Sequence, residues 1–352
     1  MDKESIKNIF ALKTTRRDTT NSAYATRMMS VAKKYKAYKG NDENFTSFDF
    51  LKDVEDVMLF ITTTPNSRKD KNGEYGLPSN TTQIGMINPI SEYCLAINEH
   101  ILANEYLKYK NVIDDKIKST YQKNGGITNI QKENIISYED LVTYTYKIDS
   151  EIKIYEDKPL KTFTEVWMLN DLKAVKILMR LYLLHPSRNE YAGLKFITLR
   201  DYRKLKQPEY NYVVIGQKFS YLSITNYKTS GKYGLKLSQI TDKPLLKMLK
   251  SLKNVRDFEE KENLFYLQKT GMPWDNYNLC NILTKFSKKY MDGKSIGSTL
   301  IYKIVIAEAG LNYNEALEND DIVNAIKFNE ILAKYARSRG HSQKVQKDFY
   351  IA

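Results

Sequence analysis

The sequence predicts a mainly α-helical protein with one small antiparallel β-sheet, an α+β fold. Its 352 residues are enough for two domains, each with a buried core. Apolar residues recur at helical spacing in several long segments, whereas the alternation typical of strands is confined to residues 212–240. The chain contains no internal repeat and no low-complexity tract, so a repeat architecture is excluded.

Residues 1–40 are predicted to form a basic N-terminal arm that is partly helical. The segment carries ten Lys and Arg side chains against three acidic ones, so it holds +7 of the net charge of +13. Two roles fit such a segment: it tracks DNA through its phosphates, or it is a solubilising tail.

Residues 41–122 are predicted to form a small helical domain. Apolar residues follow a helical period in 48–62 and again in 84–107, while 63–82 is rich in Pro, Gly and Asn and is typical of a loop. The polar run that begins at Lys123 predicts a linker region over 123–160.

Residues 161–352 are predicted to form the second domain. A long helix over 163–184 should end before Pro186, because proline cannot continue a helix. Further helices are expected after Lys243, over 298–309 and over 322–335. Between them, three segments alternate as strands do, namely 212–215, 219–226 and 234–240, with a turn at 228–232.

The charge balance predicts a polyanionic partner. Lys and Arg number 55 against 42 for Asp and Glu, with a pI near 9.2, which favours nucleic acid or an anionic membrane surface. The most apolar stretch, 166–184, is interrupted by charged residues and predicts a core helix, not a membrane span. Two distant cysteines and a polar N-terminus predict an intracellular, reducing location without a metal site.

The end of the chain carries the most informative chemistry. His341 follows Gly340 and precedes Tyr350 by nine residues. A tyrosine hydroxyl, with a pKa of about 10, attacks only when its electrophile is held and neutralised and a neighbour exchanges a hydrogen bond. In a basic protein the natural electrophile is a DNA phosphodiester. The plainer interpretation is that Tyr350 is a surface or packing residue, one of 27 tyrosines.

Two upstream segments fit the same chemistry. Arg188 follows Pro186 and is expected to open the next helix, where its planar guanidinium group can bind a phosphate. Glu190 is expected to support that helix start, because the helix dipole favours a carboxylate there. Lys228 lies at a predicted hairpin tip and can protonate a leaving oxygen, although lysines at hairpin tips are commonly only solvated.

Arg188, a lysine in a hairpin, Gly-His-Ser and Tyr350, in that order, resemble the tyrosine recombinase (phage-type integrase) family. The form of the first box, Pro-Ser-Arg-Asn-Glu-Tyr-Ala, and the hairpin Tyr-Lys-Thr-Ser-Gly-Lys-Tyr-Gly look most like recombinases of large DNA viruses, virophages and related mobile elements. The resemblance covers about residues 160–352. The segment 41–120 resembles the family's core-binding domain by position and character.

The resemblance implies a site-specific recombinase or integrase that cleaves and rejoins double-stranded DNA without metal, cofactor or ATP. Tyr350 would attack the phosphate to form a 3′-phosphotyrosine and a free 5′ hydroxyl. Arg188 would hold the non-bridging oxygens, and His341 would bind a phosphate oxygen or assist Tyr350. Lys228 would be the general acid, with Lys232 as the second candidate. The implied assembly is a homo-tetramer on paired DNA sites.

One box departs from the family pattern. The family has His-x-x-Arg at a helix start, where this chain has Thr299 and Tyr302. Lys303 is adjacent but should face about 100° away on a helix, and it is most simply a solvated residue. Lys303, Arg337 or Arg339 substitutes for the missing arginine, or the enzyme is slow or inactive.

Two alternatives share the fold and the nucleophile site. A type IB-like topoisomerase would use the same tyrosine as a monomer, and a non-catalytic DNA-binding protein would keep the fold alone. The hairpin followed by Gly-His-Ser favours the recombinase. Only Ile351 and Ala352 follow Tyr350, whereas the family often places there a helix that contacts the next protomer.

Overall fold

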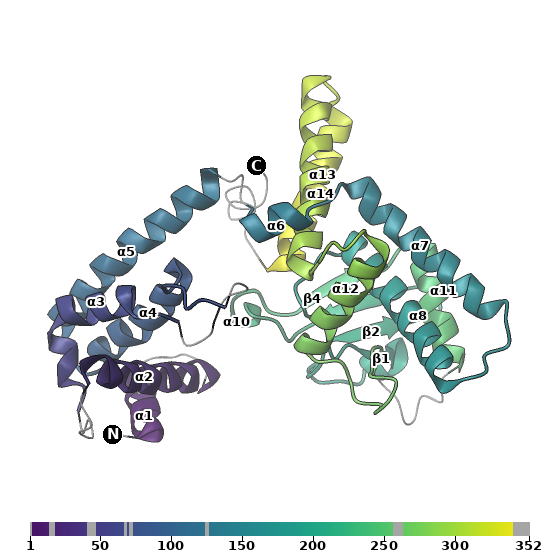
Figure 1. Ribbon diagram of the computed structural model, residues 1–352. Coiled ribbons are helices and arrows are strands. Elements are labelled where there is room, and N and C mark those ends of the chain that lie inside the picture. The colour runs from purple at the N-terminus through teal and green to yellow at the C-terminus, as the bar shows by residue number, and fades with distance from the viewer. Residues whose placement is uncertain are drawn as a thin grey trace. The chain divides into compact units, whose positions relative to one another are not determined.

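The computed structural model divides into two compact units, Met1–Asn124 and Gly125–Ala352 (Figure 1). The residues that it describes are 2–13, 18–40, 47–66, 69, 73–123, 127–255 and 263–340. His341 and Tyr350 therefore lie outside the described residues. No described helix has both the length and the apolar character that crossing a membrane requires.

The first unit is helical throughout its described part. Its elements are α1 (Lys3–Lys13), α2 (Asp18–Lys39), the 3-10 helix η1 (Asp49–Lys52), α3 (Val54–Thr63), α4 (Asn80–Ala96) and α5 (His100–Lys123). One core joins them, and its centre includes Val57 of α3, Ile90 of α4 and Tyr106 of α5, all fully buried. The hydroxyl of Tyr106 donates a hydrogen bond to the carbonyl oxygen of Leu51, so the long α5 is tied to η1.

The segment predicted as an N-terminal arm is part of this core. Ile6 and Phe10 of α1 and Met28 of α2 are fully buried, and Tyr35 of α2 stacks on Phe50. The spacing of four between Ile6 and Phe10 places both on one helix face. The net charge of the segment hid this apolar face, because the lysines and arginines occupy the other sides of the helices.

The second unit is mainly helical and contains one small sheet. Its helices of six or more residues are α6 (Asn129–Asn134), α7 (Tyr138–Glu156), α8 (Phe163–Leu184), α11 (Lys243–Val255), α12 (Asn276–Tyr290), α13 (Ser298–Glu318) and α14 (Ile322–Arg339). The short helices are α9 (Leu199–Tyr202) and α10 (Ser230–Tyr233). The α+β class expected from the sequence is therefore confirmed.

The sheet is mixed and not antiparallel as predicted. Its strands are β1 (Lys195–Thr198), β2 (Tyr212–Ile215), β3 (Tyr221–Ile224) and β4 (Lys236–Gln239), in the order β1-β2-β3-β4. β1 pairs parallel with β2, and the other two pairs are antiparallel. The four-residue β1 was missed because the segment before it was assigned to a helix start. A turn with Gly193 at φ +67° leads into β1 instead.

The helix α8 is the central helix of the second unit, with the bounds expected from the sequence. Thr162 and Glu165 form a capping box at its start, and the helix ends at Leu184, with His185 as the C-cap residue directly before Pro186. Leu172, Leu178 and several neighbours are fully buried in a core shared with the sheet and with α7, α11, α12 and α13.

The segment predicted as a linker, 123–160, is mostly helical. It contains α6 and α7, and α7 packs against α8 through Leu141, Tyr144 and Ile148. These three residues follow the helical spacing of three and four, which a polar start at Lys123 concealed. Both helices belong to the second unit.

We expect Leu178→Ala to lower the free energy of unfolding of the second unit by about 2–5 kcal/mol, because it empties a packed site that is 0% exposed. Urea unfolding of the full chain, followed by hydrogen exchange and mass spectrometry of peptides, reports the two units separately. Leu311→Ala, on the exposed side of α13, is the matched control and should change the free energy of unfolding by less than about 0.5 kcal/mol. Equal losses in both variants would contradict this account of the core.

Candidate functional site

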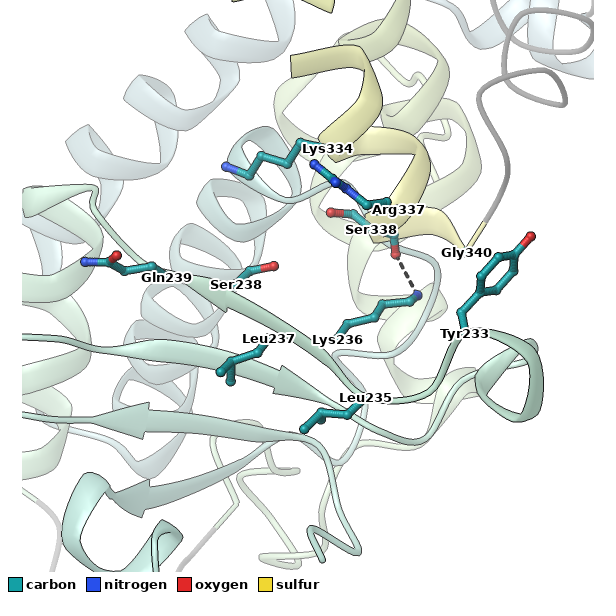
Figure 2. A pocket seen from close by; sticks show the side chains of 10 residues that line it. All are labelled: Tyr233, Leu235, Lys236, Leu237, Ser238, Gln239, Lys334, Arg337, Ser338 and Gly340. Atoms are coloured by element: carbon teal, nitrogen blue, oxygen red, sulfur yellow. Dashed lines mark hydrogen bonds between the residues drawn. The ribbon is translucent and has the colours of Figure 1, made fainter. Parts of the chain in front are cut away.

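The C-terminal end of α14 is fastened by side chains from three other segments, namely β4, the loop after α8 and the connection between β3 and α10. The carbonyl oxygen of Ser338 accepts hydrogen bonds from Lys236 Nζ at 3.1 Å, drawn in Figure 2, and from Ser187 Oγ at 3.3 Å. The carbonyl oxygen of Gly340 accepts one from Thr229 Oγ1 at 3.3 Å. The last carbonyls of a helix have no partner within it, so these bonds satisfy them and hold the helix end against β4 and the loop after α8.

The loop that carries Arg188 is held from several sides. The carbonyl oxygen of Arg188 accepts a hydrogen bond from the hydroxyl of Tyr182 of α8 at 2.8 Å, and the carboxylate of Glu190 accepts one from Ser187 Oγ at 2.7 Å. Arg188 is half-buried and Glu190 is buried. The two residues do not open a helix, as the sequence predicted, but lie in a bend and a turn before β1.

The neighbouring Asn189 links this loop to two helices. Its side-chain oxygen accepts a hydrogen bond from Ser298 Oγ of α13 at 2.7 Å, and its amide nitrogen lies 3.3 Å from Cys280 Sγ of α12. The position of Arg188 is therefore set by α8, α12 and α13 together.

Arg339 places a guanidinium group at the two positions where the family's second box was expected. Its Nη2 donates to Thr299 Oγ1 at 3.0 Å, and its central carbon lies 4.6 Å from the centre of the Tyr302 ring. Its Nη1 donates to the carbonyl oxygen of Ser187, next to Arg188, at 2.7 Å. Of the three substitutes considered from the sequence, Arg339 is thus the one that contacts this position. Only 3% of the residue is exposed.

Lys303 is buried and not solvated as first expected. Its ammonium group donates to Gln131 Oε1 of α6 at 2.8 Å. Burial, and to a smaller extent the charge of Arg339, lower the pKa of this lysine to about 8. Lys303 therefore ties α13 to α6, on a different side of the helix from Tyr302.

Lys236 is a site residue that sequence reasoning missed. Burial lowers its pKa to about 8, with Glu190 acting to raise it and Arg188 and Arg339 acting to lower it. Its ammonium nitrogen also lies 3.4 Å from the centre of the Tyr227 ring. The strand alternation contains the signal, since Leu235 and Leu237 are exposed and the residue between them must face inward.

The two lysines that were predicted remain at the surface. Lys228 lies on the connection between β3 and α10, and both it and Lys232 of α10 are exposed. Lys232 lies 5.3 Å from the ring centre of Tyr233. Tyr227 and Thr229, on either side of Lys228, both face Gly340.

A groove of about 510 Å³ lies between β4 and the end of α14 (Figure 2). It is lined by Tyr233, Leu235, Lys236, Leu237, Ser238, Gln239, Lys334, Arg337, Ser338 and Gly340. Three of these residues are cationic and none is acidic. The chain continues from Gly340, at this groove, to His341.

Within the described ranges, no group of three or more His, Cys, Asp or Glu side chains is placed to hold a metal ion. No protein-family model, curated protein or solved structure matches the chain. The arrangement of Arg188, Lys236 and Arg339 is therefore the main guide to function.

We expect Gly340→Ala to destabilise the second unit by about 1–3 kcal/mol, because φ is +70° and an added Cβ would lie 2.4 Å from Thr229 Oγ1. Thermal unfolding of Gly340→Ala, of Gly231→Ala and of the double variant with Thr229→Ala checks this. Gly231→Ala is the control, because its Cβ would meet no atom within 4 Å. The double variant should recover only the part of the loss that comes from the clash. Loss of stability in Gly231→Ala alone would contradict the account.

The buried lysines predict a pH dependence of stability. Because the pKa of Lys303 is about 8 in the folded protein, against 10.5 for an ordinary lysine, the unfolded chain binds more protons between these values. The free energy of unfolding should therefore rise from about pH 8 to pH 10.5. In Lys303→Met the rise should be smaller, and the remainder is assigned to Lys236 and Lys334, because burial lowers the pKa of both. Urea titrations at several pH values measure it, with the exposed Lys250→Met as control. An unchanged rise in Lys303→Met would refute the assignment.

Proposed function

We propose that the second unit is a DNA strand transferase of the tyrosine recombinase type, in which Tyr350 attacks a phosphodiester and becomes joined to the 3′ phosphate. The observation that carries the proposal is the convergence of Arg188, Lys236 and Arg339 at the end of α14, directly before the segment that contains His341. A cluster of cations around an open groove suits a phosphate, whose negative charge grows in the transition state.

Arg188 and Lys236 are assigned to the phosphate itself. Both are partly exposed, and both lie near the buried carboxylate of Glu190, which balances part of their charge. Arg188 offers two parallel donors to the non-bridging oxygens. The attack breaks the bond from phosphorus to the 5′ oxygen, and this oxygen must receive a proton.

The proton donor is a lysine in this proposal. Lys236, with its pKa of about 8, is mostly protonated at neutral pH yet releases a proton more readily than an ordinary lysine. Lys228 is the alternative general acid, as the sequence resemblance implies, and Lys232 is the next candidate. This alternative requires the exposed turn to move onto the DNA. Lys236→Met and Lys228→Met assayed in parallel separate the two.

Arg339 is proposed to act as a positioning residue. Its side chain is buried, and its hydrogen bonds end on Ser187 and Thr299, so it supports the Arg188 loop from behind. It also adds positive charge where the family has its second arginine. His341 is proposed to bind a phosphate oxygen or to assist Tyr350, and the described residues include neither.

The first unit is proposed to complete a clamp around double-stranded DNA as the core-binding domain, and strand exchange would require a homo-tetramer on paired DNA sites. A type IB-like topoisomerase would share the covalent step but act alone. The net charge of +13 supports DNA binding in both cases. Joining of two duplexes, as opposed to relaxation of supercoiled plasmid by the monomer, distinguishes them.

We expect the full chain to form a covalent adduct with nicked duplex DNA that survives denaturing electrophoresis. A labelled pool of nicked duplexes with randomised sequence is the substrate, because no recognition sequence is specified in advance. Tyr350→Phe should abolish the adduct, and Arg188→Met should slow its formation by about 10²–10³. Peptide mass spectrometry should place the DNA on Tyr350.

Tyr233→Phe is the matched control, because it removes the hydroxyl of an exposed tyrosine that lines the groove and should leave the adduct intact. DNA binding without any adduct would favour a non-catalytic DNA-binding protein. An adduct that persists in Tyr350→Phe would reject the assigned nucleophile.

A further inference from the structure

The hairpin of α13 and α14 projects beyond the rest of the second unit (Figure 1). Near its base a small core that includes Tyr302, Ile306 and Leu332 joins the two helices. Toward the tip the helices face each other through the buried Ala316 and Ala325. Small residues allow close approach, so the hairpin is held together by its own contacts and needs no other element to support its tip.

The tip of this hairpin, defined here as residues 311–326, has an unusual surface. It exposes five large apolar side chains, namely Leu311, Leu317, Ile322, Val323 and Ile326. Ile322, Val323 and Ile326 lie on the first turns of α14. Ile322 is four residues and Val323 three residues before Ile326, which places the three side chains on one face. A cluster of exposed apolar side chains on a soluble surface usually marks a contact with another molecule.

The tip is also acidic in a basic protein. It contains Glu315, Glu318, Asp320 and Asp321 and no Lys or Arg, whereas the whole chain has a net charge of +13. Asp321 caps α14 by accepting from the backbone nitrogen of Asn324. The other three carboxylates are exposed, and none forms an ion pair with a described residue. They are therefore oriented to solvent or to a partner with the opposite charge.

The groove between β4 and the end of α14 has the complementary character. β4 is the last strand in the order of the described sheet, and around it Tyr233, Leu235 and Leu237 are exposed. Lys334 and Arg337 of α14 form the cationic side of the groove (Figure 2). An apolar and basic groove matches an apolar and acidic tip.

A chain cannot insert its own tip into its own groove. The two surfaces lie at opposite ends of α14, which has 18 residues and contains neither Gly nor Pro. At about 1.5 Å per residue, the helix keeps Val323 and Arg337 roughly 20 Å apart. A second copy of the chain necessarily carries the matching surface.

We propose that the tip of the α13–α14 hairpin docks into the β4–α14 groove of a second copy of this chain. The contact is head-to-tail, because each copy offers a tip at one end and a groove at the other, and such contacts build rings or open chains of protomers. The small groove implies a weak contact that depends on concentration. The observations behind the contact are independent of the DNA chemistry proposed above, although both would use the same groove, so a docked tip and a bound phosphate would compete for it.

The test is sedimentation equilibrium of the full chain, without DNA, over a series of concentrations. The wild-type mass should increase with concentration, and added NaCl should oppose the increase by screening the charges. The tip variant, Ile322→Ser with Val323→Ser and Ile326→Ser, should associate at least about tenfold more weakly, and so should the groove variant, Leu235→Ser with Leu237→Ser. Circular dichroism checks that both variants fold.

Mixing the two variants makes the test decisive. The tip variant keeps an intact groove and the groove variant keeps an intact tip, so an equal mixture should form dimers although each alone does not. The matched control, Ile130→Ser with Ile154→Ser, replaces exposed isoleucines elsewhere in the second unit and should associate like wild type.

A wild-type protein that stays monomeric up to its solubility limit would overturn the proposal. Tip variants that associate normally, or a mixture that forms no dimers, would do the same. Adduct formation on nicked DNA by the tip variant is measured in parallel, so that a failure of the contact is distinguished from a failure of the proposed chemistry.

Discussion

The hydrogen bonds that fasten the last turn of α14 are the constraint on which the candidate site depends. The carbonyl groups there need donors from outside the helix, and the donors come from Lys236, Thr229 and Ser187. Each donor belongs to a segment that carries a predicted or newly found site residue. Satisfying the helix end therefore brings the Arg188 loop and β4 to one place.

The same contact explains how a guanidinium group can be buried at Tyr302. Arg339 lies in the last turn of α14, so its side chain points into the space between the Arg188 loop and the start of α13. There it finds a hydroxyl, a carbonyl and an aromatic ring, which compensate for the loss of water. A guanidinium group from α14 thus lies beside the positions of α13 at which the resemblance leads one to expect an arginine.

Much of the fold could be predicted from the sequence, where local signals are strong. The bounds of α8 follow from a capping box at one end and Pro186 at the other. β1 could not be predicted, because four residues carry too little pattern and its partner lies across a loop. The candidate site residues also fall into those that a local motif predicts and those that only the fold brings together. Arg188 and Glu190 could be named as candidates from their motif, whereas Lys236 and the contact of Arg339 with Thr299 depend on long-range packing.

The charge of the chain predicts a polyanionic partner, but it concealed local structure. In α1 and α2 the basic residues surround an apolar face that belongs to the core, and at the hairpin tip the local charge opposes the total. Net charge therefore describes long-range attraction, while burial has to be judged residue by residue.

The uninterrupted helix α14 has a mechanical consequence. It has neither glycine nor proline along its 18 residues, and its last turn holds the buried Arg339. A helix without these residues resists bending. If its exposed N-terminal end is tilted, its C-terminal end therefore moves as well. A molecule that binds the N-terminal end of α14 would therefore also shift Arg339 and the cations beside it at the C-terminal end.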